Sequence, residues 1–185
     1  SEVEELRERI KELNKRVLDT VRRVLERVKE LNEEVDRRNK EVIKEVERLL
    51  EEVKREVTRE KDSKKLIDDL AKRLEDIVRK SKKDTRELVK RSKRINDEAE
   101  KLVRKLVEES RKVLEDAAEV LKKDRDRRAE KIVDDIRRHS EDVVRRMRKL
   151  VEDSRRHSKR VVEEMERSNR ELEERVKRVV EELKR

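Results

Sequence analysis

The chain has 185 residues, of which 59% are charged, 31% are apolar and none is aromatic, and its formal net charge is +9. It contains no cysteine, which excludes disulfides, zinc–thiolate sites and thiol nucleophiles. No run of apolar residues exceeds three, so we expect no transmembrane span or signal peptide. A soluble chain made in the cytoplasm is the default expectation, and the localisation itself stays open.

The first third of the chain carries an apolar stripe with a regular repeat. Its positions advance in steps of 3, 4, 3, 4 and 4 residues from Val3 to Val53, with Asn39 as one polar member. One set of steps equals five turns of an α-helix, about 18 residues, so the stripe stays on one face of a straight helix. The pattern predicts a first helix over about residues 2–60, and Ser1 followed by Glu4 is typical of a capping box.

Two segments without apolar residues, 58–65 and 122–128, interrupt the stripe, which restarts in a new phase after each of them. The residues available to cap the following helices are Asp62 or Ser63, and Asp124 or Asp126. A second helix is therefore expected over about 63–122 and a third over about 126–184. The alternative, one uninterrupted helix of 185 residues, conflicts with both phase breaks.

Short connections make consecutive helices antiparallel neighbours. The sequence therefore predicts an all-α fold: an up-down-up antiparallel three-helix bundle, formed as a single domain over residues 1–185. Each helix is expected to be straight, to have about 60 residues and to be about 90 Å long.

Folding the chain back at about residues 61 and 124 brings polar residues of the three stripes to common levels. One layer combines Asn14 and Ser110 with His139 and Ser140, and another, one repeat away on every helix, combines Asn32 and Ser92 with His157 and Ser158. Two less regular groups are Asn39 with Ser81 or Thr85 and Ser168 or Asn169, and Asn96 with Ser154.

A buried polar group without a partner costs about 1–3 kcal/mol. Three helices that each supply such a group at one level can satisfy one another, whereas a shifted register places the groups against Val or Leu. We therefore interpret these residues as buried network candidates that set the helix register, as a buried Asn does in a coiled coil.

The two histidines lie in near-copies, Asp-Ile-Arg-Arg-His-Ser ending at residue 140 and Asp-Ser-Arg-Arg-His-Ser ending at residue 158. Asp and His four residues apart can orient an imidazole for metal binding or catalysis. However, the histidines are about 27 Å apart along one helix, with no further His or Cys nearby. We interpret them as network or boundary residues, and we predict no enzyme activity, no metal site and no cofactor.

Positive charge is concentrated in two stretches: residues 79–94 hold nine basic residues against two acidic ones, and residues 145–160 hold eight against two. Such bands can attract phosphate backbones at low salt. Because stacking aromatics and base-reading motifs are missing, we predict no specific nucleic-acid partner, and no membrane partner either.

The regularly repeating stripe, the repeated Asn, Ser and His-Ser layers, and a Glu, Lys and Arg surface over a Val, Leu and Ile core resemble those of de novo designed helical bundles. In that class, straight parametric helices enclose buried hydrogen-bond networks. The resemblance implies a designed structural scaffold with no natural biochemical function, whose polar layers set register and pairing specificity.

Two alternatives stay open. Each helix carries a second apolar column beside the stripe, for example Leu18 and Leu25 on the first helix and Val107 and Leu114 on the second. This column is compatible with a closed monomer that needs no partner, or with an assembly module that self-associates or accepts a partner helix. A natural spectrin-like spacer is a remote alternative, because such repeats normally contain Trp and Gly.

Overall fold

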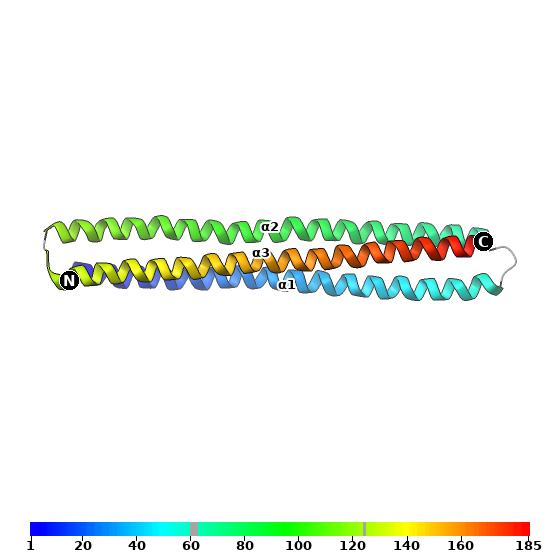
Figure 1. Cartoon of the computed structure of the whole chain (residues 1–185), viewed down its shortest axis with the longest axis horizontal. Helices are drawn as coiled ribbons and strands as arrows, with labels where there is room; N and C mark the ends of the chain where they lie inside the picture. The colour runs from blue at the N-terminus through cyan, green and yellow to red at the C-terminus, as the bar shows by residue number, and fades with distance from the viewer. Residues whose placement is uncertain (60–62, 124) are drawn as a thin grey trace. The chain divides into compact units, whose positions relative to one another are not determined.

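The structure is a computed structural model that describes residues 1–59, 63–123 and 125–185. These residues form three long α-helices: α1 (Glu2–Arg59), α2 (Lys64–Lys123) and α3 (Arg127–Lys184). Within each of the two compact units given below, segments of α1, α2 and α3 pack against one another, and Figure 1 labels the three helices. The predicted all-α, three-helix, up-down-up fold is confirmed.

The helices begin at the polar residues that the sequence provides for this purpose. The Glu4 backbone N–H donates to the Ser1 Oγ at 3.3 Å, which is one half of a capping box, and the Ser1 ammonium forms an ion pair with the Glu4 carboxylate at 3.8 Å. The Asp126 carboxylate accepts the backbone N–H of Arg128 at 3.3 Å, so Asp126 caps α3. Helix α2 follows Ser63; the alternative caps Asp62 and Asp124 lie outside the described residues.

The contacts divide the chain into two compact units. Unit 1 comprises Ser1–Lys29 and Lys93–Arg156, and unit 2 comprises Glu30–Ser92 and His157–Arg185. Each unit therefore contains one segment of α1, one of α2 and one of α3, packed around its own core. A single domain over residues 1–185 remains a prediction.

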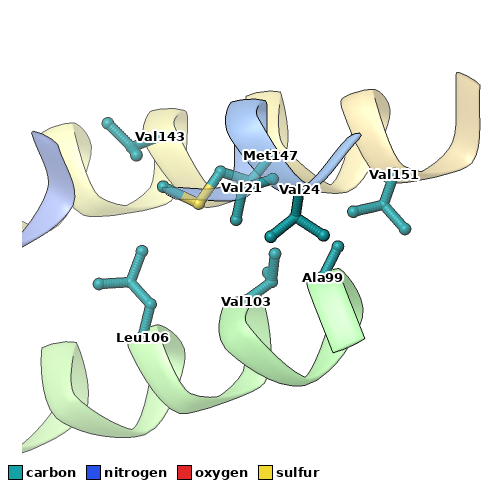
Figure 2. Close-up of a cluster of buried hydrophobic side chains, with 8 residues drawn as sticks. All are labelled: Val21, Val24, Ala99, Val103, Leu106, Val143, Met147 and Val151. Carbon is teal, nitrogen blue, oxygen red and sulfur yellow. The ribbon is translucent and has the colours of Figure 1, made fainter. Parts of the chain in front are cut away.

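Two apolar clusters form the core of unit 1. Figure 2 shows the first, in which side chains of all three helices point toward one another: Val21, Val24, Ala99, Val103, Leu106, Val143, Met147 and Val151. The second contains Val3, Ile10, Val113, Ala117, Ile132, Val133 and Ile136. Burying one Val, Leu or Ile side chain contributes about 1.5–3 kcal/mol, so these clusters are the main source of stability in a chain without aromatic residues.

The core of unit 2 contains one cluster of the same kind, again with members from every helix. Its buried residues are Val46, Leu50, Val53, Leu70, Leu74, Leu172, Val176 and Val179. Both units thus use the aliphatic residues that the repeating stripe places on one helix face.

Candidate functional site

Most of the polar residues predicted to form layers lie in the core. The buried ones are Asn14, Asn32, Asn39, Ser81, Thr85, Ser92, Asn96, Ser110, Ser140, Ser158 and Asn169. The half-buried ones are His139, Ser154, His157 and Ser168. On α1 the amides of Asn14 and Asn32 are more deeply buried than the adjacent Leu13 and Leu31, which are half-buried. The core of each unit therefore contains polar groups at its centre.

Asn32 joins all three helices of unit 2 through its single carboxamide. The Ser92 Oγ on α2 donates to the Asn32 Oδ1 at 3.0 Å, and the Asn32 Nδ2 donates to the Ser158 Oγ on α3 at 3.0 Å. All three residues are less than one-tenth exposed. The layer thus uses both ends of the amide and contributes about 0.5–1.5 kcal/mol per hydrogen bond.

A second polar group of unit 2 joins only α1 and α2. The Ser81 Oγ donates to the Asn39 Oδ1 at 2.7 Å. The Thr85 Oγ1 donates to the Ser81 carbonyl at 3.0 Å, which is a bond within α2 and not between helices. On α3, Asn169 is buried with its Oδ1 unpaired, and Ser168 is half-buried. Of the residues predicted to share this level, only Asn39 and Ser81 are joined by a hydrogen bond between helices.

In unit 1, the predicted pair on α2 and α3 is hydrogen-bonded. The Ser154 Oγ donates to the Asn96 Oδ1 at 2.7 Å, and Asn96 is almost fully buried. This bond joins residues 58 positions apart in the chain and so fixes α2 against α3 at one level.

The Asn14 layer of unit 1 is buried but lacks hydrogen bonds. Both polar atoms of the Asn14 side chain and the Oγ atoms of Ser110 and Ser140 have no partner among the described residues. In sequence, the three residues lie between members of the two apolar clusters of unit 1. The expectation that this layer is bonded like its copy is not met, because a hydrogen bond also requires close approach and alignment.

The hydrogen bonds found for the Asn32 layer among the described residues involve two serines and no histidine. His139 is half-buried, and the Nε2 of the half-buried His157 has no hydrogen-bond partner. Among the described residues, no three or more His, Cys, Asp or Glu side chains gather in a way that could hold a metal ion. No helix in the described parts of the chain is long and apolar enough to cross a membrane.

A groove runs between α2 and α3 of unit 1 beside the unpaired serines. Its volume is about 630 Å³, and the Oγ-bearing residues Ser110 and Ser140 belong to its lining. The apolar part of the lining consists of Val107, Leu114, Ala118 and Val144. The second apolar column of α2 and α3 is therefore partly uncovered here.

Ion pairs between helices are the contacts that sequence patterns did not indicate. In unit 1, Arg155 donates to Asp97 at 2.8 Å and to Glu100 at 2.6 Å, and the hydrogen bond to Asp97 is the largest of the effects that raise the pKa of Arg155. In unit 2, Arg175 lies 2.9 Å from Glu47. Because the surface is densely charged, the sequence is compatible with many different ion pairs. It contains no pattern that singles out the pairs formed by Arg155 and Arg175.

Comparison with known proteins supports the fold. No protein-family model matches the chain, and no curated protein matches it. A solved structure described as "Computationally designed three helix bundle" is similar, with a TM-score of 0.69 and 20% sequence identity, over 99% of this chain and 89% of that chain. The similarity defines the class of the fold, a three-helix bundle.

Proposed function

We propose that the chain is a designed structural scaffold without a natural biochemical activity, in which buried polar residues set the register of the helices. The observation that supports this most directly is the Asn32 carboxamide, which bonds to one serine on each of the other two helices. Sliding α2 or α3 separates Asn32 from its partner and leaves buried polar groups unsatisfied, at about 1–3 kcal/mol each.

Two layers of equal composition, one repeat apart on every helix, do not by themselves exclude a slip by one whole repeat. The Asn39–Ser81 pair does, because it has no copy one repeat away: Val21 and Ala99 occupy the corresponding positions. The Asn96–Ser154 pair is equally unrepeated, since the corresponding positions one repeat away are Leu114 with Ile136 in one direction and Val78 with Leu172 in the other. The less regular pairs therefore give the register its uniqueness.

A cross-linking test in unit 1 measures this role directly, because the chain has no cysteine of its own. Asp97→Cys with Arg155→Cys, treated with a short bismaleimide, reports the native register, since the Asp97 carboxylate and the Arg155 guanidinium form an ion pair at 2.8 Å, and a reporter closes when its cross-link forms. Asp97→Cys with Arg137→Cys reports a slip of α3 by one repeat. We expect only the native reporter to close in the parent chain.

Both reporters should close when Asn96→Leu and Ser154→Ala remove the unrepeated pair. In this variant, the slipped register leaves fewer buried polar groups without a hydrogen bond than it does in the parent chain. Closure of the native reporter alone in that background would show that apolar residues set the register and would refute the proposed role. Circular dichroism of each variant provides the control that the helices are retained.

A second candidate function is that of an assembly subunit that accepts a partner helix. The uncovered groove between α2 and α3 of unit 1 favours it. Light scattering coupled to size exclusion tests self-association: at a mass of 22.6 kDa the chain does not pair with itself, and a partner helix would then have to come from another protein. A mass twice that value would show that the chain itself is the partner.

A further inference from the structure

The part of α2 that belongs to unit 2 carries a strongly one-sided charge on its surface. Residues 79–92 hold seven basic residues against two acidic ones. The basic residues, all of them exposed, are Arg79, Lys80, Lys82, Lys83, Arg86, Lys90 and Arg91. The register function proposed above uses none of these side chains, so the concentration of positive charge needs a separate explanation.

The two acidic residues of this segment lie on the side of α2 that faces α1. Asp84 and Glu87 line a small cavity of about 70 Å³, together with Arg38 of α1 and Arg91 of α2. Two carboxylates and two guanidinium groups thus surround this cavity, and their charges balance. The excess of positive charge therefore belongs to the rest of the helix surface.

Two of the remaining cations are already paired. The Arg79 guanidinium lies 3.3 Å from the Asp76 carboxylate on its own helix, and the Lys82 Nζ lies 2.9 Å from the Glu173 carboxylate of α3. A phosphate group would have to displace these carboxylates, so neither cation is counted as available.

Four cations remain, and they lie along one face of α2. They are Lys80, Lys83, Arg86 and Lys90, none of which forms an ion pair within the part of the chain that the structure describes. Steps of three and four residues make side chains neighbours on a helix surface. From the first to the last of them, the helix advances about 15 Å. We call these four residues the cationic row.

The adjacent part of α3 does not neutralise the cationic row. Arg86 lines a pocket of about 230 Å³ to which α3 contributes Glu166, Asn169 and Arg170. The carboxylate of Glu166 is matched there by the guanidinium of Arg170, so their charges cancel. The row therefore keeps its four positive charges, and it faces solvent.

A nucleic-acid duplex is the partner whose chemistry fits this row best. Duplex DNA carries one negative charge per about 1.7 Å of its axis, so about 15 Å of duplex presents about nine phosphates to four cations. Protein and membrane partners depend on apolar anchors. Among the described residues, the one large apolar side chain that is exposed is Val89. Because the chain has no aromatic residue to stack on bases, the contact is restricted to phosphates.

We propose that the cationic row of α2 binds the phosphate backbone of duplex nucleic acid without reading its sequence. The ammonium groups of Lys80, Lys83 and Lys90 and the guanidinium of Arg86 donate to phosphate oxygens, and counterions of the duplex are released. This agrees with the prediction of no specific nucleic-acid partner, because specificity requires contacts to base edges. The binding is independent of the scaffold function, since no member of the row belongs to a polar layer.

The probe is a fluorescein-labelled DNA duplex of about 12 base pairs, which is about 40 Å long. Fluorescence anisotropy with the full chain should show saturable binding at low salt. The logarithm of the Kd should rise linearly with the logarithm of the salt concentration, with a slope of about 3–4 for four phosphate contacts. A duplex of equal length and different sequence should bind with nearly the same Kd, and a preference of about tenfold or more would overturn the proposal.

Neutralising the row tests whether binding takes place there. Lys83→Gln, Arg86→Gln and Lys90→Gln together should raise the Kd about a hundredfold at about 50 mM salt and lower the salt slope by about 3. All three side chains are exposed, so the helices should be retained, which circular dichroism checks.

A matched control variant lies on α1 of the same unit. Lys44→Gln, Arg48→Gln and Arg55→Gln lower the net charge equally, but in a segment, residues 44–55, that holds four basic and four acidic residues. These side chains are also exposed. The control should leave the Kd and the salt slope nearly unchanged. Equal weakening by both triple variants would show that binding follows net charge alone and would refute the site.

Two further results would overturn the proposal. One is no saturable binding of the duplex at about 20 mM salt, where counterion release is most favourable. The other is tighter binding to phosphatidylserine vesicles than to the duplex, which would assign the row to a membrane surface. Neither result affects the scaffold function, because the cross-linking test detects loss of register in the absence of nucleic acid.

Discussion

The Asn32 layer and the Asn14 layer have the same residue types at the same spacing, yet they differ in structure. In unit 2, Asn32 is hydrogen-bonded to Ser92 and Ser158. In unit 1, the amide of Asn14 has no partner at either end. Both asparagines are essentially fully buried, with Asn14 at 1% and Asn32 at 0% exposure. Burial of the asparagine is therefore not sufficient to form such a network.

The surroundings of the serines differ between the two layers. Ser110 and Ser140 of the unbonded layer line the groove between α2 and α3. Ser92 and Ser158 of the bonded layer are each hydrogen-bonded to Asn32. The bonded layer thus stabilises the folded chain, whereas the unbonded layer leaves buried polar atoms without hydrogen bonds.

The largest expected difference is between Asn32→Leu and Asn14→Leu. Asn32→Leu removes two buried hydrogen bonds and strands two hydroxyls, whereas Asn14→Leu removes two unsatisfied atoms and adds apolar contact. We expect Asn14→Leu to be more stable than Asn32→Leu by about 2–3 kcal/mol. Denaturant unfolding followed by circular dichroism measures this difference, and equal stabilities would show that the layers are energetically alike.

A smaller difference is expected when the serines are changed and the asparagines are kept. Ser92→Ala with Ser158→Ala should destabilise the chain by about 1–2 kcal/mol, because Asn32 loses both partners. Ser110→Ala with Ser140→Ala should leave the stability unchanged or raise it. The same unfolding experiment applies; a cost for the second pair equal to that of the first would indicate that its hydroxyls are satisfied in solution.

Arg155 allows the buried layers to be compared with a surface contact, because its ion pairs with Asp97 and Glu100 join α3 to α2 in unit 1. We expect Arg155→Gln to cost about 0.5–1 kcal/mol, reduced because the side chain is about one-third exposed. The neighbouring Arg156 pairs with Glu152 on its own helix and provides a matched control, with an expected cost for Arg156→Gln below about 0.5 kcal/mol. High salt should diminish the difference between the two variants.

The smallest expected effect is a pH dependence of stability. It comes from the Arg38–Glu34 ion pair of unit 2, which follows Asn32 on α1. The hydrogen bond from Arg38 lowers the carboxyl pKa of Glu34 below its ordinary 4.5. A lowered pKa contributes stability above the unfolded-state value, and this contribution is lost as the pH falls through the folded-state value. Arg38→Gln should therefore be slightly destabilising at neutral pH and neutral in acid. A pH-independent difference between the two chains would contradict this assignment.

Much of the fold could be predicted because it depends on patterns that extend over many residues and tolerate small errors in position. The period of the apolar stripe specified the helix faces, and two phase breaks gave three helices. Folding back at those breaks also paired Asn32 with Ser92, and Asn96 with Ser154, which are hydrogen-bonded.

The bonding state of each layer could not be predicted, because it depends on finer geometry. An error of one residue in level is about 1.5 Å along a helix, whereas hydrogen-bond lengths vary by about 0.5 Å. The alignment that placed Asn14 beside Ser110 is therefore too coarse to show whether they bond. The Arg155 contacts were missed for a different reason: long charged side chains reach many partners from one position.

The shared amide of Asn32 has a consequence for sequence variation. Because one side chain serves residues on both other helices, positions 32, 92 and 158 are expected to be epistatic. A single apolar replacement leaves polar groups stranded, but simultaneous apolar replacement of all three leaves none. In a mutational library, functional sequences should therefore contain either the complete polar triplet or a complete apolar one, and intermediates should be depleted.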